Sequence, residues 1–173
     1  MKQTILILVI SILTLGFTIP KPIEKKIDKE IGSVFEIDSF SKTLLTFEED
    51  VESKMFVPFD DDNFFKILVE ENLIGYFYYG KAPSKTEEFD FLVVFDKDLI
   101  IKRIKILAYR EDYGGEISSK RWLKQFVGLT DEEIDYSKDI KAISGATISA
   151  RSMTKSVNDL LKSVSILQNK NQL

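Results

Sequence analysis

Four β-rich runs with short polar turns between them constrain the fold more than any other feature of the sequence. The run pair Phe64–Ala82, FFKILVEENLIGYFYYGKA, has its turn at Glu71-Asn72, and the pair that begins at Phe89 has its turn at Asp96-Lys97-Asp98. Short runs joined by tight polar turns predict an antiparallel meander of about four strands. In the last run, 101–109, apolar residues fall on both faces, so we expect it to lie inside the sheet with helices nearby.

Helical patterns follow the meander. After a Gly114-Gly115 loop, Ser118 or Ser119 offers a cap for a helix that Gly128 ends. A long helix is predicted from about residue 147 to residue 167, because its apolar residues recur at helical spacing. Those predicted core positions are Met153, Val157, Leu160, Leu161, Val164 and Leu167. The expected fold is a single α+β domain, an antiparallel sheet with flanking helices over 64–167, followed by a frayed tail at 168–173.

The N-terminal region differs in composition from the rest of the chain. Its apolar run from Ile5 to Phe17 is shorter than the roughly 20 residues that span a bilayer, and Pro20 follows it. Residues 1–20 are therefore interpreted as a secretory signal peptide or an N-terminal membrane anchor, which places the rest outside the cytoplasm. A lead-in segment occupies 21–63; it is charged and amphipathic from 21 to about 30, and then rich in phenylalanine and acidic residues with mixed periodicity. Its triplet at 60–62 lacks the glycine and later glutamate of a calcium loop, so a solvated turn is expected.

Composition excludes several classes of function. The chain has no histidine and no cysteine, which excludes disulfides, thiol catalysis, iron–sulfur clusters and the usual zinc sites. A net charge of −4 gives no basic footprint for nucleic acid. Histidine-based acid–base catalysis is also excluded, and no nucleophile–base pair or metal site stands out. If this protein transfers electrons, an organic cofactor must carry them.

One short motif suggests a ligand. Ser144-Gly145-Ala146-Thr147 joins a segment of β character, 140–143, to the long helix. The first turn of a helix has unsatisfied N–H groups and partial positive charge, and a glycine lets the backbone approach a ligand closely. Such a place suits a phosphate. The alternative is that Ser144 or Thr147 only caps the helix.

The strands, the segment YGGEISSKRWLKQF and the motif AISGATIS together resemble the FMN-binding domain family, over roughly 64–164. That family includes the C subunit of the sodium-translocating NADH:quinone reductase and the G subunit of the Rnf complex. The resemblance implies FMN as the cofactor, bound at Ser144, Gly145, Ala146 and Thr147. It further implies a phosphoester from FMN to Thr147, made by a separate magnesium-dependent flavin transferase that uses FAD and releases AMP.

The resemblance also places the Gly-Gly loop near the flavin ring. Glu116, Ile117 and Trp122 are the expected contacts. The alternatives are that the Gly-Gly loop is only a tight turn between a strand and a helix, and that Trp122 is only a core residue. One departure stands out: the family pattern has an acidic residue six positions before the modified threonine, where this chain has Lys141. If the transferase requires that carboxylate in register, attachment would be slow or absent and FMN would bind without a covalent bond, or Asp139 would substitute. Attachment to Thr147 remains the favoured interpretation.

The resulting interpretation is an extracytoplasmic electron carrier, more a redox subunit than a self-sufficient enzyme. Its expected partners are the flavin transferase and a membrane or extracytoplasmic redox protein, with membrane association through the N-terminus and no nucleic acid. Two alternatives remain. One is a non-redox accessory or binding module of the same fold, in which SGAT caps a helix or holds FMN or another phosphate ligand non-covalently. The other is a structural envelope protein, which leaves SGAT without a role.

Overall fold

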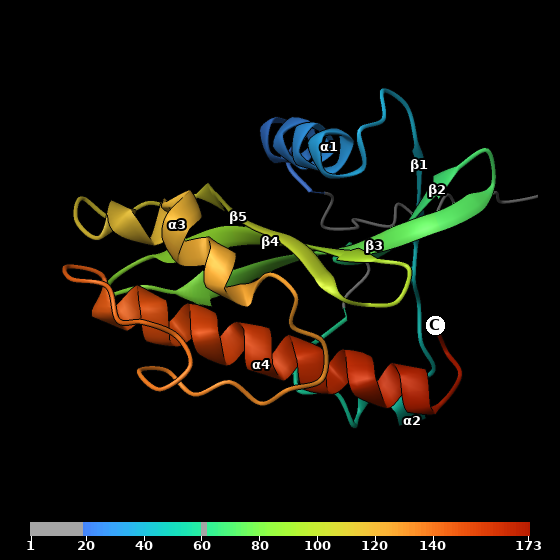
Figure 1. Cartoon of the computed structure of the whole chain (residues 1–173). Coiled ribbons are helices and arrows are strands. Elements are labelled where there is room, and N and C mark those ends of the chain that lie inside the picture. The colour runs from blue at the N-terminus through green and yellow to red at the C-terminus, as the bar shows by residue number, and fades with distance from the viewer. Residues whose placement is uncertain (1–18, 60–61) are drawn as a thin grey trace, which may run out of the picture.

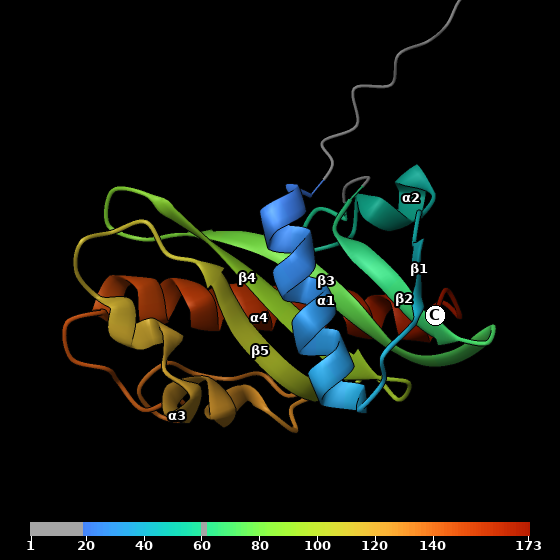
Figure 2. The same ribbon diagram turned by 90° about the horizontal axis from the view of Figure 1, so that it is seen from above.

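The computed structural model describes residues 19–59 and 62–173. The apolar run at 5–17 and two residues of the acidic triplet, Asp60 and Asp61, lie outside these ranges. Five strands form one antiparallel sheet in the order β1-β2-β3-β4-β5. They are β1 (Ser41–Leu44), β2 (Phe64–Val69), β3 (Asn72–Pro83), β4 (Glu88–Asp96) and β5 (Ile101–Ala108). Helix α1 (Lys21–Phe35) covers one face and α4 (Thr147–Asn169) covers the other, giving three layers (Figures 1 and 2).

The larger core lies between the sheet and α4. All six apolar positions predicted for the long helix are buried, which confirms the helical interpretation of that segment. Facing them are sheet residues such as Phe64, Phe91 and Phe95, each at most 1% exposed. Strand β4 is buried from Phe89 to Phe95 because helices cover both faces of the sheet. The α+β prediction is therefore confirmed.

A second core lies under α1. Ile23, Ile27 and Ile31 recur every four residues, so they share one helix face and pack on the sheet. Pro22 in the first turn suits a helix start, because its missing N–H would have no partner there anyway. The helix ends at Glu36, which adopts a left-handed backbone with φ of 56°. The lead-in segment thus supplies a helix for one face of the sheet and the edge strand β1.

The four predicted strands are confirmed as β2 to β5. The sheet has a fifth strand that was not predicted, because β1 pairs with β2 from Ser41 opposite Leu68 to Leu44 opposite Phe65. One expectation for the sheet was wrong. The last run, β5, lies at the edge and not inside the sheet. Its apolar residues face helices on both sides, which explains the mixed pattern. Part of this edge is covered: Ile101 donates its N–H to Leu129 and accepts one from Gly128.

The segment after the Gly-Gly loop is a chain of single turns and not one continuous helix. These are η1 (Gly115–Ser118), α3 (Lys120–Leu123) and η2 (Lys124–Phe126), separated at Ser119 by an extended backbone. Ser119 occupies the position before α3, yet its side chain makes no capping hydrogen bond. Gly128 follows with φ of 93°, as expected for a residue that ends a helical segment.

The predicted strand at 140–143 does not form. Ile140 makes only an isolated bridge to Tyr136. The next residue cannot join a ladder, because the backbone N–H and carbonyl of Lys141 are bonded to the side chains of Gln125 and Trp122. The tail is also more ordered than expected, since α4 continues to Asn169 and Leu173 packs against the core.

The remaining helix is α2 (Glu49–Glu52), a single turn between β1 and β2. Within 19–59 and 62–173, no helix combines the length and the apolar character needed to cross a membrane.

Candidate functional site

The SGAT motif forms the turn that starts α4. Thr147 is the first helical residue, and Gly145 adopts a left-handed backbone with φ of 81°. No side chain caps this helix, so neither Ser144 nor Thr147 plays the capping role considered from the sequence. Ser144, Gly145 and Thr147 are exposed, whereas Ala146 is buried. The exposed Thr147 hydroxyl therefore stands at a helix N-terminus whose partial positive charge no side chain satisfies.

The backbone at Gly145 is open to a ligand. A β-carbon placed there would meet only Glu116, whose Oε2 would lie 3.8 Å away, an ordinary contact distance. The absence of a side chain at this left-handed position thus leaves room directly beside the helix start. A phosphate group could approach the first-turn amides through this space, which is the geometry that anion sites at helix N-termini use.

The Gly-Gly loop packs directly on the SGAT turn. A β-carbon on Gly114 would lie 3.2 Å from the carbonyl oxygen of Gly145 and 3.4 Å from Cβ of Ala146. Gly114 is buried and has φ of 87°, so both its backbone and its surroundings require glycine. Two segments that are about thirty residues apart in the sequence therefore form one surface.

Tyr109 connects this loop to the first turn of α4. Its hydroxyl donates a hydrogen bond to the carbonyl of Tyr113 at 3.1 Å and shares another with the hydroxyl of Ser149 at 3.0 Å. Ser149 is 3% exposed, so its hydroxyl needs a partner inside the protein. A single phenol thus fixes the Gly-Gly loop relative to the helix that carries Thr147.

A carboxylate holds the opposite side of the loop. Glu111 accepts hydrogen bonds from both the side chain and the backbone of Thr86, from the hydroxyl of Ser84 and from the backbone of Glu87. The bonds from the Thr86 backbone and the Ser84 hydroxyl, with the others, lower the pKa of Glu111 from 4.5 to about 2. The turn between β3 and β4 is thereby tied to the Gly-Gly loop.

An ion pair between a buried carboxylate and a half-exposed arginine lies next to Glu111. Arg110 binds both oxygens of Asp90, at 3.1 and 2.6 Å, and Asp90 is 1% exposed. Burial, together with the negative charge of Asp90, raises the pKa of Tyr79 to about 12. Tyr79 thus stays protonated at neutral pH. The segment that leads from β5 to the Gly-Gly loop is therefore fixed at Arg110 by two hydrogen bonds to Asp90.

Comparison with known families agrees with this geometry. Residues 85–162 match the sequence model of the FMN-binding domain, a match that includes the Gly-Gly loop, the SGAT turn and most of α4. The chain contains an FMN-binding domain. Its cofactor is accordingly FMN, as the resemblance implied, and the domain is that of a flavin-binding protein suited to electron transfer. No curated protein matches the chain.

The FMN-binding domain places the three expected ring contacts in different environments. Glu116 is exposed and lies beside Gly145. Ile117 is fully buried in the core and donates its backbone N–H to the carbonyl of Gly114, so it presents no exposed surface to a ligand. Trp122 is 5% exposed, packs edge-on against Phe126 and donates its Nε1 hydrogen to the carbonyl of Lys141 at 2.8 Å. A role for Trp122 in holding the segment before SGAT follows directly, whereas its contact with flavin stays a prediction.

The residue that departs from the family pattern is held firmly by its backbone. Lys141 donates its N–H to Oε1 of Gln125 and accepts the bond from Trp122, while its side chain is exposed. Asp139, the nearest upstream carboxylate, accepts the backbone N–H of Asp135 at 2.8 Å. The Asp139 carboxylate is thus engaged in its own turn, which makes it a poor substitute for an acidic residue at position 141.

Sequence reasoning missed several residues at this site. Tyr113, next to Gly114, is 87% exposed, and Ile148, next to Thr147, is 53% exposed. Both offer uncovered apolar surface beside the turn, and the lone tyrosine in a polar glycine loop was a usable signal. Arg151 follows Thr147 by four residues, on the same helix face, and lies 5.5 Å from the ring centroid of Tyr136. Its charge complements a phosphate.

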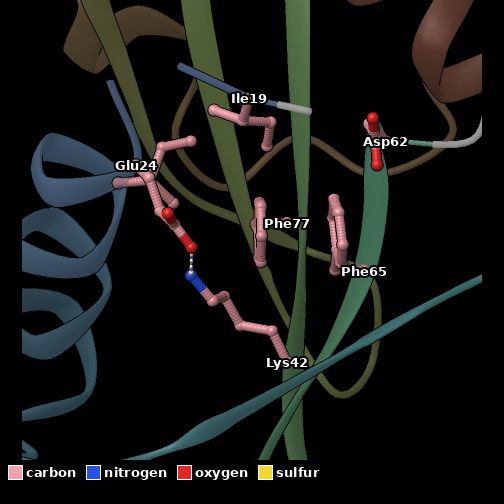
Figure 3. A pocket seen from close by; sticks show the side chains of 7 residues that line it. Ile19, Glu24, Lys42, Asp62, Phe65 and Phe77 are labelled. Carbon is pink, nitrogen blue, oxygen red and sulfur yellow. Dashed lines mark hydrogen bonds and ion pairs between the residues drawn. The ribbon is translucent and has the colours of Figure 1, made fainter. Parts of the chain in front are cut away.

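A cavity among the described residues lies elsewhere. It has a volume of about 180 Å³ and lies under α1, on the face of the sheet opposite α4 (Figure 3). Phe65 and Phe77 stack along one wall and Lys42 bonds to Glu24 at another. Ligand pockets usually measure about 300–1,000 Å³, so this cavity is too small for FMN. It also lies in a different layer from the SGAT turn.

Metal binding finds no support in the described ranges. Across 19–59 and 62–173, no three acidic side chains come together in a way that could hold a metal ion.

Proposed function

We propose that this protein is an extracytoplasmic electron carrier whose FMN is joined to Thr147 through a phosphoester bond. The observation that carries the proposal is the exposed Thr147 hydroxyl at the uncapped start of α4, within an FMN-binding domain. Bound FMN supplies one- and two-electron transfer, and the protein supplies position and electrostatics. The export and the anchoring are inferred from the apolar N-terminal run.

The attachment is a phosphoryl-group transfer. A separate flavin transferase would bind FAD, and the Thr147 oxygen would attack the phosphorus on the flavin side of the pyrophosphate. The new P–O bond replaces the bond to AMP, which leaves, and the hydroxyl proton is released. After transfer the phosphodiester keeps one negative charge, which the first-turn amides and Arg151 are placed to stabilise.

The site fits a carrier better than an enzyme with its own substrate. The Gly-Gly loop and the SGAT turn form an exposed surface with Tyr113 and Ile148 beside it. The chain has no histidine or cysteine to serve as a catalytic base or nucleophile there. An exposed flavin on such a surface could meet the flavin or metal centre of an unidentified redox partner.

The test is co-expression of the full chain with a flavin transferase. The wild-type protein should give a fluorescent band on a denaturing gel, and peptide mass should place FMN on Thr147. Thr147→Ala should abolish the fluorescence, whereas Ser144→Ala, which removes an exposed hydroxyl three residues earlier, should retain it. A protein that is yellow when native but dark when denatured would show non-covalent FMN. A colourless protein in both states would defeat the proposal and favour the accessory module.

Lys141 provides a second test of the same proposal. If the transferase reads an acidic residue at this position, Lys141→Asp should raise the initial rate of attachment. Asp139→Asn should leave that rate unchanged, because the Asp139 carboxylate is engaged with the backbone of Asp135. A loss of attachment in Asp139→Asn would instead show that Asp139 substitutes for the missing acid. The measurement is the time course of in-gel fluorescence with purified transferase and FAD.

A further inference from the structure

Helix α1 has a buried, apolar face and, opposite to it, an exposed face on which lysines recur. Ile23, Ile27 and Ile31 pack on the sheet, and the exposed residues Lys21, Lys25 and Lys29 recur with the same four-residue spacing. With 3.6 residues per turn, this second series lies on the side of the helix away from the isoleucines. The three lysines therefore form a stripe, about 12 Å long at 1.5 Å per residue, that points away from the sheet.

The acidic residues of α1 are turned toward the sheet and neutralised there. Glu24 and Asp28 both bind Lys42 of β1, at 2.8 and 2.9 Å. On the other flank, Glu30 binds two cations of β5, at 3.0 and 3.4 Å. These cations are Arg103 and Lys105.

The lysine stripe has no such partners. Within the described residues, Lys21, Lys25 and Lys29 form no ion pair. The charges of α1 are thus largely sorted by direction, with the acids inward and three of its four lysines outward. The fourth, Lys26, donates to the carbonyl of Leu107 in β5. This local excess of positive charge runs against the net charge of −4 of the whole chain. It marks a surface that fits a negatively charged partner.

We propose that the lysine stripe of α1 docks on the anionic headgroups of a phospholipid bilayer. The apolar run that ends at Phe17 stops four residues before Lys21, so insertion of that run would bring α1 to the membrane surface. Basic residues immediately beside a membrane-inserted segment are attracted to anionic lipids. A flat lipid surface also suits a straight, single-signed stripe on the outermost layer of the protein.

Docking in this way would orient the flavin site. Helix α1 and helix α4 lie on opposite faces of the sheet (Figures 1 and 2). With α1 against the headgroups, the SGAT turn at the start of α4 lies in the layer that faces away from the membrane. The cofactor would then remain accessible to a partner in the aqueous phase.

The natural absence of cysteine makes a clean test simple. Ser33 is exposed and continues the stripe four residues after Lys29. A fluorophore on Ser33→Cys in the full chain would report proximity to lipids whose headgroups carry a nitroxide quencher. Vesicles would contain phosphatidylcholine alone or phosphatidylcholine with phosphatidylglycerol. The same fluorophore on Ser119→Cys provides the reference, at an exposed position just before α3, which lies beside the β5 edge of the sheet (Figure 2).

The proposal predicts stronger quenching at Ser33 than at Ser119. Quenching at Ser33 should also be stronger in vesicles that contain phosphatidylglycerol than in neutral ones, and this difference should shrink at high salt. Changing the three stripe lysines to glutamine should shift the docking equilibrium by about a hundredfold, from roughly fivefold for each lysine near an anionic surface. The matched control neutralises three exposed lysines elsewhere, at positions 54, 85 and 97, and should leave the quenching unchanged.

Three results would overturn the proposal. Quenching that is equal in neutral vesicles would mean that the tether alone holds α1 near the lipid. Quenching that survives loss of the stripe lysines would remove their role. An absence of quenching in anionic vesicles would show that the stripe does not bind lipid, and would favour a soluble acidic protein as its partner. None of these outcomes depends on flavin attachment, which the gel fluorescence measures separately.

Discussion

Gly114→Ala should destabilise the protein, and the size of the effect can be worked out from its surroundings. An alanine at φ of 87° costs about 1–2 kcal/mol because its β-carbon crowds the backbone. That β-carbon would also lie 2.7 Å from the Tyr109 hydroxyl and 3.2 Å from the Gly145 carbonyl. Forcing a methyl group into a filled space costs typically ~1–3 kcal/mol. We therefore expect a loss of about 2–5 kcal/mol in the free energy of unfolding.

The neighbouring glycine provides the control. A β-carbon on Gly115 would have no atom within 4 Å, so Gly115→Ala should change stability by less than ~0.5 kcal/mol. Urea unfolding of the flavin-free proteins measures both changes, and the thermal midpoint of Gly114→Ala should fall by roughly 5–12 °C. If the two variants were equally stable, the Gly-Gly loop would not pack on the SGAT turn as described. A large loss for Gly115→Ala alone would refute the reasoning in the same way.

Three further predictions concern the residues around the site. Because the pKa of Glu111 is lowered to about 2, its ionised form stabilises the fold above pH 4.5, and this stability is lost as the pH falls toward 2. Glu111→Gln should therefore flatten the decline of the thermal midpoint in that range, as melts from pH 7 to pH 2 would measure. Arg110→Gln should cost about 2 kcal/mol in urea unfolding, because the buried carboxylate of Asp90 loses a doubly bonded cation. Trp122→Phe should cost about 1 kcal/mol, since it removes the hydrogen bond to the carbonyl of Lys141; an unchanged melting temperature would contradict that assignment.

The parts of the fold that the sequence predicted are those with a strong local pattern. The predicted apolar residues of α4 recur at helical spacing over about four turns, and the turn at 96–98 separates two clear strands. These patterns depend only on neighbouring residues, so sequence reasoning could use them. The SGAT motif was likewise recognised by its small residues and its place before a helix.

Local patterns failed where distant contacts decide the structure. Strand β1 has only four residues, and it is a strand because β2 pairs with it. The segment after Ile140 looked like a strand, yet the side chains of Gln125 and Trp122 bind the backbone of Lys141. The contact of Gly114 with Gly145 and the bond from Tyr109 to Ser149 join segments far apart in sequence. The spacing of residues along the sequence does not predict such long-range contacts.

The two edges of the sheet bear on how this protein behaves when crowded. An exposed edge strand can recruit a strand from another molecule and so begin an aggregate. Here β1 offers only four residues to such a neighbour, and the opposite edge, β5, has its first residue already bonded to Gly128 and Leu129. Further along β5, the exposed charge of Lys102 disfavours pairing with an identical strand, while Arg103 and Lys105 are already bound by Glu30 of α1. Copies concentrated side by side on a surface would thus remain separate molecules, because the edge strands of neighbouring sheets would not pair.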